Sequence, residues 1–282
     1  MRPEPFPATE TRYPERVGPR SKHRGCGPER MVLHLLQLGR IPYEEGLRIM
    51  REVADARKAG RVGDTLLLME HPPVLTLGRN ATRANILASD DLLKLKGVTL
   101  HETNRGGDVT YHGPGQLVGY PIFDLYGDLP GKRGAFLGPV DFVRLMEEAL
   151  IFVAKDFGVP AQRIAGRTGV WTCAGGSVQE KKLAAIGIHV SRGVTTHGFA
   201  LNVTTDLRDF QLIVPCGIAD RGVTSLEDET TLPEPPTLQQ ASNSAANHFG
   251  RVFQRQMLAS DSIDDLLNAS VAPSASLAGI SR

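Results

Sequence analysis

The chain has 282 residues, of which 41% are hydrophobic and 22% are charged, and its formal net charge is +1 at pH 7. This composition is typical of a globular protein, and no apolar run approaches the ~20 residues of a membrane-spanning helix. A nearly neutral charge balance argues against the strongly basic surface of a nucleic-acid-binding protein. The three cysteines include no Cys-X-X-Cys pair, so neither a disulfide framework nor a zinc site is predicted.

Residues 1–30 are predicted to be a disordered extension. They are rich in proline and charge and lack the apolar stretch of a signal peptide. The periodic segments that follow predict a single mixed α/β domain over residues 31–258, because strands and helices are interspersed without a regular βαβ rhythm. Residues 259–282, rich in serine and alanine, are predicted to be a flexible tail.

The hydrophobic spacing predicts the elements of this domain in chain order. We expect a strand at 31–40, a helix with Tyr43, Leu47, Met50 and Ala54 on one face, two short strands separated by Pro72-Pro73, a short helix around Leu92, strands at 97–102 and 117–125, a helix at 138–159, and strands at 168–173, 181–191 and 194–203.

A helix is also predicted near the C-terminus. Thr237 and Gln240 form a capping-box pattern, and an apolar stripe at helical spacing follows them. The members of this stripe are Leu238, Ala241, Ala245, Phe249, Val252 and Met257.

Residues 104–116, NRGGDVTYHGPGQ, are unusually rich in glycine. Glycines allow backbone N–H groups to approach an anion or a polar ligand. Nucleotide phosphate binding does not fit, because there is no GxxxxGK[ST] motif and the GxGxxxG pattern is one residue longer than the dinucleotide fingerprint. Turns between strands are an alternative. Arg105, Tyr111 and His112 in the same loop favour a site for a carbonyl-bearing group.

Cys216 is the candidate nucleophile among the three cysteines. Cys26 lies in the N-terminal extension, and Cys173 continues a strand pattern, which is typical of a buried cysteine. Pro215 and Gly217 place Cys216 in a tight loop after an apolar segment. There a thiol can be presented and a backbone N–H can point at a developing oxyanion.

A nucleophilic cysteine needs a partner that takes its proton. The candidates are His112, His197 and Lys182. In a regular strand, Lys182 would share a face with Ala184, Ile186, Ile188 and Val190, and a lysine on so apolar a face can accept and donate a proton. The alternative is that Lys182 ends the strand and points to water, as Lys181 does.

Three segments together resemble the octanoyltransferases of lipoate biosynthesis, also called lipoyl(octanoyl) transferases. They are RGGDVTYHGPGQLVGYPI at 105–122, KLAAIGIHVSRGVTTHGFALNV at 182–203 and IVPCGI at 213–218, and they occur in the order typical of that family. The resemblance covers roughly residues 31–230 and implies the fold of biotin and lipoate protein ligases and a cytoplasmic acyltransferase.

The resemblance also implies the site. Lys182 and Cys216 match the paired catalytic lysine and cysteine of the family. The residues that would bind the octanoyl thioester along the glycine-rich backbone are Arg105, Gly106, Gly107, Asp108, Val109, Thr110, Tyr111, His112, Ala185, Ile186, Gly187, Gly198, Phe199 and Ala200.

The implied reaction is a double displacement through a Cys216 acyl-thioester. The donor would be octanoyl acyl carrier protein and the acceptor a lysine of a lipoyl domain, with no cofactor or metal, because a thioester is already activated. We expect a monomer. Because the partners are typically acidic, we expect basic residues such as Arg79, Arg105 and Lys132-Arg133 to line the approach. A buried methylene changes affinity only about fourfold, so chain-length selectivity depends on pocket depth.

Three other functions are compatible with parts of this pattern. An ATP-dependent lipoate or biotin ligase would share the fold but has no use for the Cys216 thiol. A lipoyl amidotransferase would ignore the acyl carrier protein as donor. A non-catalytic acyl-carrier or fatty-acid binding module would tolerate loss of both Cys216 and Lys182.

Overall fold

A computed structural model describes residues 31–127, 129, 136–172, 180–214 and 222–269 of the chain. Eight strands form its large sheet: β1 (Val32–Arg40), β2 (Thr65–Glu70), β6 (Gln116–Ile122), β7 (Ala161–Ile164), β8 (Arg167–Thr172), β9 (Lys181–Ser191), β10 (Val194–Asn202) and β11 (Gln256–Ser260). Their order is β11-β1-β2-β6-β10-β9-β8-β7. The sheet is mixed, because β1 pairs in parallel with β2 and β11 while the other pairs are antiparallel.

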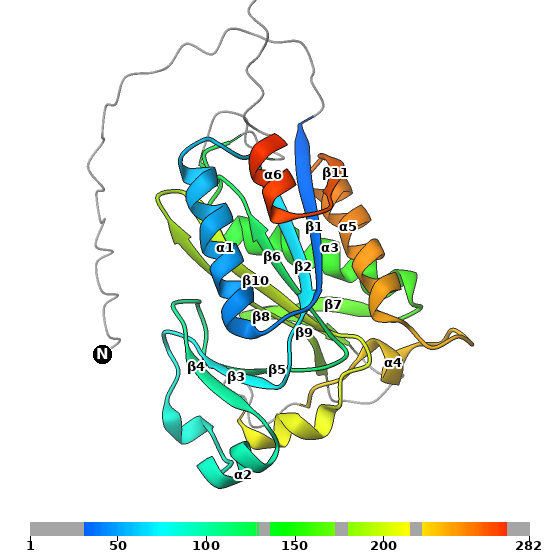
Figure 1. Ribbon diagram of the computed structural model, residues 1–282. Coiled ribbons are helices and arrows are strands. Elements are labelled where there is room, and N and C mark those ends of the chain that lie inside the picture. The colour runs from blue at the N-terminus through cyan, green and yellow to red at the C-terminus, as the bar shows by residue number, and fades with distance from the viewer. Residues whose placement is uncertain (1–30, 128, 130–135, 173–179, 215–221, 270–282) are drawn as a thin grey trace, which may run out of the picture.

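A three-stranded sheet lies at one end of the large sheet (Figure 1). Its strands are β4 (Thr99–Glu102), β3 (Val74–Leu77) and β5 (Val109–His112), in that order. The helices are α1 (Tyr43–Lys58), α2 (Asp90–Leu95), α3 (Pro139–Asp156), α4 (Leu226–Glu229), α5 (Leu238–Val252) and α6 (Ile263–Ala269), with 3₁₀ turns at Arg83–Asn85 and Leu207–Leu212.

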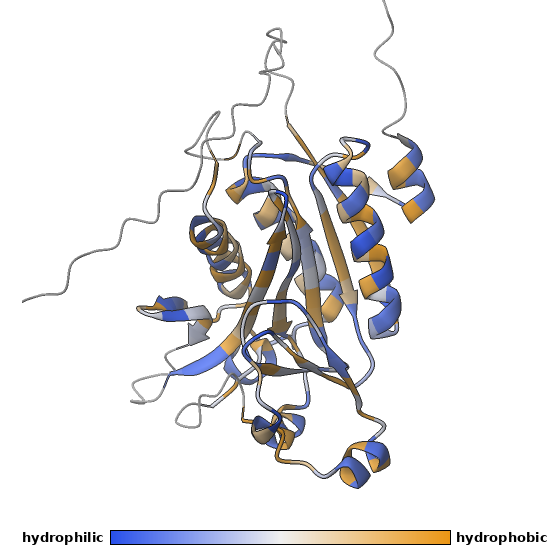
Figure 2. Ribbon diagram, turned by 90° about the vertical axis from the view of Figure 1, so that its left-hand side faces the viewer, coloured by the Kyte–Doolittle hydropathy of each residue, from blue (hydrophilic) through white to orange (hydrophobic). Residues whose placement is uncertain are grey.

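Helices cover both faces of the large sheet. In Figure 1, α1 and α6 lie on the near face, while α3 and α5 lie behind the strands. The core on the α1 side includes Leu47, Met50 and Leu266, and the core on the other side includes Phe142 and Phe249. Figure 2 shows mostly apolar strands between helices whose outer sides are polar, as expected for a sheet buried on both faces.

Most of the predicted elements are present. The helix after Pro42, the strands flanking Pro72-Pro73 and the β9–β10 hairpin at Arg192-Gly193 are confirmed. Thr237 and Gln240 form the predicted capping box of α5. No helix in the described part of the chain is long and apolar enough to cross a membrane.

The predicted C-terminal boundary at residue 258 is wrong. Helix α5 ends at Val252, and Met257 belongs to β11, which pairs with β1 rather than continuing the helical stripe. Helix α6 follows, and its Leu266 is fully buried against the α1 side of the molecule. The ordered domain therefore continues to Ala269. The predicted extension at 1–30 and the rest of the tail lie outside the described residues.

Candidate active site

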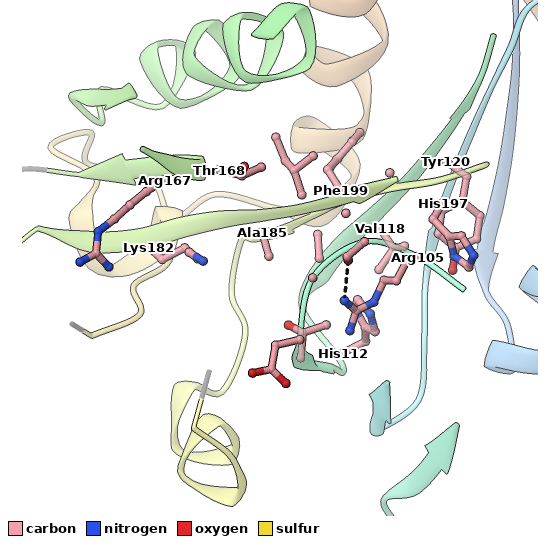
Figure 3. Close-up of a pocket in the computed structure, with 18 of the residues that line it drawn as sticks. Arg105, His112, Val118, Tyr120, Arg167, Thr168, Lys182, Ala185, His197 and Phe199 are labelled. Atoms are coloured by element: carbon pink, nitrogen blue, oxygen red, sulfur yellow. Dashed lines mark hydrogen bonds between the residues drawn. The ribbon is translucent and has the colours of Figure 1, made fainter. Parts of the chain in front are cut away.

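A cavity of about 470 Å³ lies where the glycine-rich segment crosses the middle of strands β9 and β10. Figure 3 shows Lys182 at one end of this cavity, Tyr120, His197 and Arg105 at the other, and Ala185 and Phe199 between them. The predicted residues that line it are Arg105, Gly106, Gly107, Asp108, Thr110, His112, Lys182, Ala185, Ile186, Gly187, Gly198, Phe199 and Ala200. We call it the acyl pocket, after the ligand that the sequence resemblance leads us to expect there.

Val109 and Tyr111 do not line the acyl pocket, contrary to the sequence prediction. Residues 109–112 form strand β5 rather than a loop, so successive side chains point to opposite faces. Thr110 and His112 face the pocket, whereas Val109 and Tyr111 belong to a separate apolar cluster with Phe210. There the Tyr111 hydroxyl donates to Asp209 Oδ2 at 2.8 Å.

Lys182 is only 9% exposed, which rules out the alternative that it points to water as a strand end. Its Nζ lies 4.8 Å from the centroid of the Trp171 ring, within the range of a cation–π contact. Lys181, next to it, is more exposed and pairs with Glu229 at 3.2 Å. The two adjacent lysines therefore have different environments.

A register shift in β9 determines where Lys182 points. Trp171 pairs with Lys182 but Val170 pairs with Ala184, so one residue of β9 is left unpaired between them. Such a bulge reverses the alternation of side chains. Ala184 accordingly packs in the central core, while Lys182 shares the pocket wall with Ala185. The predicted burial of Lys182 is confirmed, but the predicted common face with Ala184 is wrong.

Cys216 lies outside the described residues, so the distance between its sulfur and Lys182 is not given by the structure. Both flanks of segment 215–221 are nevertheless attached to the pocket. Lys182 N donates to Gly222 O at 2.9 Å, and Thr224 N donates to Lys182 O at 3.0 Å. On the other side, Val214 N donates to Asn85 O at 2.8 Å.

The second flank also leads to the pocket wall. The Asn85 side-chain amide donates to Asp108 Oδ2 at 2.5 Å, and Asp108 lines the acyl pocket. Position 216 is six Cα–Cα steps from Gly222, a reach of up to about 20 Å in extended chain. The chain therefore enters and leaves the segment containing Cys216 beside the cavity that contains Lys182.

The glycines of this site allow backbone to pack against backbone. Gly106 N donates to Ile188 O at 2.9 Å, and a Cβ at Gly187 would lie 2.6 Å from Gly106 O. A side chain at residue 187 would separate the two segments. Gly106 and Gly187 thus allow the pocket wall to close against β9. The sequence interpretation instead expected the glycines to let a ligand approach the backbone.

Arg105 holds this wall in place from inside. It is 9% exposed, and its guanidinium donates to Thr76 O at 2.7 Å and to Gly106 O at 3.1 Å. The prediction that Arg105 lines an exposed approach for an acidic partner is therefore wrong. Lys132-Arg133, predicted for the same role, lie outside the described residues.

The end of the pocket opposite Lys182 is polar but uncharged apart from Arg105. Burial, followed by repulsion from neighbouring positive groups, lowers the pKa of His112 and of His197 to about 3. The Gln116 amide nitrogen donates to the Tyr111 carbonyl, so its Oε1 faces His112 and accepts from Nδ1 at 2.7 Å. Both histidines are therefore neutral near pH 7. In Figure 3 they lie on the side of the pocket away from Lys182.

Sequence reasoning missed several residues that line the pocket. Tyr43 comes from the start of α1, and Val118 and Tyr120 come from β6. Gly166 in the turn between β7 and β8, with Arg167 and Thr168 at the start of β8, closes the side near Lys182. The period-two pattern of 117–122 could have placed Val118 and Tyr120 on one face. No local pattern marks Tyr43, since it also belongs to the apolar face of a helix.

The fold and this cavity define the class. The model of the lipoyl protein ligase A/B catalytic domain family matches residues 42–250. A bi-partite lipoate protein ligase from Thermoplasma acidophilum superposes with a TM-score of 0.63 over 85% of this chain and 91% of that chain. Its 18% sequence identity makes this a likeness of fold. The predicted mixed α/β fold of lipoate protein ligases is confirmed.

Within that class, sequence similarity is strongest to curated octanoyltransferases. The octanoyltransferase of Acidobacterium capsulatum is 64% identical over 238 residues, which is 84% of this chain and 96% of that protein. The octanoyltransferase of Koribacter versatilis is 49% identical, over 84% of this chain and 90% of that protein. The chain belongs to the octanoyltransferase family and is an acyltransferase.

Proposed function

We propose that the chain transfers an octanoyl group from octanoyl acyl carrier protein to a lysine of a lipoyl domain, through a thioester on Cys216. The general activity, octanoyl transfer in lipoate biosynthesis, follows from the family. The donor, the covalent intermediate and the residue roles are our proposal.

The observation that carries this proposal is the position of Lys182. Lys182 is only 9% exposed and lines the cavity. Its backbone is hydrogen-bonded to Gly222 and Thr224, which follow the segment that contains Cys216. The middle of the cavity is lined by Val118, Ala185 and Phe199. An apolar acyl chain fits this lining, with its reacting carbonyl at the lysine end.

In the first half-reaction, Lys182 Nζ accepts the thiol proton of Cys216. The resulting thiolate attacks the carbonyl carbon of the donor thioester and forms a new C–S bond. The original C–S bond breaks, and the departing carrier thiolate takes back a proton from Lys182. The products are the acyl-enzyme and the free carrier thiol, so no ATP is consumed.

In the second half-reaction, the side-chain amine of the acceptor lysine attacks the acyl-enzyme carbonyl. The C–N bond forms, the C–S bond to Cys216 breaks, and Lys182 passes a proton from the amine to the leaving thiolate. Burial lowers the pKa of His112 and of His197 to about 3, which makes them weak bases and favours Lys182 as the proton carrier. Neither step calls for a metal, and no group of three or more potential ligands occurs among the described residues.

The proposed cellular setting follows from the nucleophile. Cys216 must remain a free thiol, which suits a reduced compartment such as the cytoplasm. All the residues given a role belong to one chain, so we propose that a monomer is active. Arg79, which is exposed, remains the described candidate for contact with an acidic partner.

The proposal is tested by transfer to a purified lipoyl domain from octanoyl acyl carrier protein, with ATP absent. We expect transfer by the wild-type chain and a loss of at least about 100-fold in Lys182→Ala, the usual contribution of a positioned proton carrier. Lys181→Ala is the matched control, since that lysine contacts Glu229 rather than the cavity. Transfer that appears only when ATP and free octanoate are supplied would identify a ligase instead.

A further inference from the structure

A second hollow, of about 580 Å³, adjoins the acyl pocket. Both are bounded by the same face of α1: Tyr43 lines the acyl pocket, while Leu47 and Met50, one and two turns further on, line the second hollow. Strands β9 and β10 also pass from one to the other, since Gly187 and Gly198 line the first and His189 and Thr196 line the second.

Among the described residues, only His197 lines both hollows. Next to it, the chain crosses from one to the other between Arg105, which lines the acyl pocket, and Asn104, which lines the second hollow. The imidazole of His197 and the backbone of residues 104–106 thus form the partition between the two spaces.

The imidazole is held in this partition by specific contacts. His197 Nε2 donates to Asn104 Oδ1 at 2.7 Å, and His197 N donates to Met50 Sδ at 3.1 Å. The residue lies within β10 yet has φ of 57°, a left-handed conformation that side chains rarely adopt. Unusual backbone geometry of this kind persists only where the surroundings enforce it.

We propose that the side chain of His197, held by Asn104, is the stop that sets the longest acyl chain the enzyme accepts. A chain whose carbonyl lies beside Lys182 runs along Ala185 and Phe199 and meets His197 at the far end (Figure 3). To go further, it would have to displace the buried imidazole, which is only 3% exposed, and break its hydrogen bond to Asn104, which costs free energy. Beyond the stop, Leu47, Met50 and Ala54 offer further apolar wall.

This inference rests on the proposed function, because it assumes that the acyl carbonyl lies at the Lys182 end. The test compares the wild-type chain with His197→Gly, Asn104→Ala and His189→Ala. Glycine readily adopts the positive φ found at residue 197, so His197→Gly removes the imidazole without adding backbone strain. Asn104→Ala removes the partner without touching the acyl pocket. His189→Ala alters the second hollow but leaves the partition intact.

Two quantities are measured for each protein. One is the rate of acyl-enzyme formation from dodecanoyl relative to octanoyl acyl carrier protein, by intact mass. The other is the affinity for dodecanoic relative to octanoic acid, by calorimetry, which needs no catalysis. We expect His197→Gly to raise both ratios at least about tenfold, since each newly buried methylene contributes about fourfold. Asn104→Ala should raise them less, and His189→Ala should leave them unchanged.

Unchanged ratios in both His197→Gly and Asn104→Ala would overturn the proposal, as would an equal rise in His189→Ala. Failure of the proposed function gives a different result: no octanoyl adduct forms on the wild-type chain. In that case the ratios of fatty-acid affinity still decide whether His197 is the stop.

Discussion

The position of Lys182 depends on a single irregularity in β9. A regular strand would direct its side chain to the side of Ala184 and the central core, but the bulge before Ala184 turns it into the acyl pocket instead. Its identity as the catalytic amine could be inferred from the sequence through the family resemblance. The direction of its side chain could not, because the bulge is set by the pairing of β9 with β8, and the residue pattern within β9 does not reveal that register.

At the same scale, His112 and His197 predict how stability depends on pH. Their pKa values are lowered to about 3 in the folded chain, against about 6.5 in the unfolded chain. The unfolded state therefore binds more protons between these values. Their contribution to stability is complete above pH 6.5 and is lost as the pH falls from 6.5 towards 3, with a slope of about 1.4 kcal/mol per pH unit for each histidine.

Urea unfolding of the wild-type chain and of His112→Gln from pH 4.5 to 8 measures this slope. The wild-type curve should lose stability more steeply below pH 6.5, so the difference between the two proteins shrinks as the solution becomes more acidic. Above pH 7 the difference should be constant. Parallel curves over the whole range would show that His112 is not buried in its neutral form.

Among the elements, α3 illustrates what spacing does and does not reveal. The apolar spacing that predicts this helix includes Phe142, Met146, Ala149 and Val153, which are fully buried, and Leu145 and Phe152, which are partly buried. The same helix also buries Glu147, which apolar periodicity does not predict. A glutamate is almost never fully buried unless it is paired. Arg144, one turn earlier in the same helix, pairs with Glu147 at 2.6 Å, but the other partners of Glu147 come from β7 and β8 and are invisible in a local pattern.

Glu147 connects α3 to the strands beside the active site. Its carboxylate accepts from Gly169 N at 3.0 Å, in β8, and from Arg163 Nε at 3.2 Å, in β7. Gly166 in the turn joining these strands and Arg167 and Thr168 at the start of β8 line the acyl pocket. Loss of this carboxylate leaves the buried N–H of Gly169 without its acceptor and removes one partner of Arg163.

We therefore expect Glu147→Ala to lower the free energy of unfolding by about 1–3 kcal/mol, the usual cost of leaving a buried N–H without its acceptor. Glu148→Ala is the matched control, because Glu148 is 48% exposed and its pair with Arg163 is worth at most about 1 kcal/mol. Urea titrations of both variants give the comparison. Equal losses would show that Glu147 acts as an ordinary surface charge.

For the molecule as a whole, the C-terminal segment is part of the fold. Strand β11 pairs in parallel with β1 at the edge of the large sheet, and α6 then packs beside α1. Parallel pairing joins segments distant in sequence, here Val32 with Gln256. The short strand and seven-residue helix have weak local patterns, so the sequence prediction ended the domain too early.

Truncation tests this reassignment. A chain that ends after Arg255 loses β11 and α6, including the fully buried Leu266, and should be destabilised by at least about 3 kcal/mol. A chain that ends after Ala269 keeps both elements and serves as the control. Thermal unfolding of the two proteins gives the comparison. A similar midpoint for both would mean that these elements contribute little to the folded state.

The central claim, that Cys216 carries the acyl group, is tested most directly by intact mass. The wild-type chain and Cys216→Ser are each incubated with octanoyl acyl carrier protein in the absence of an acceptor. We expect a mass increase of one octanoyl group on the wild-type chain, reversed by hydroxylamine, and none on Cys216→Ser. An octanoyl adduct of equal amount on both proteins, or no adduct on the wild-type chain while octanoyl transfer proceeds, would contradict the proposed mechanism.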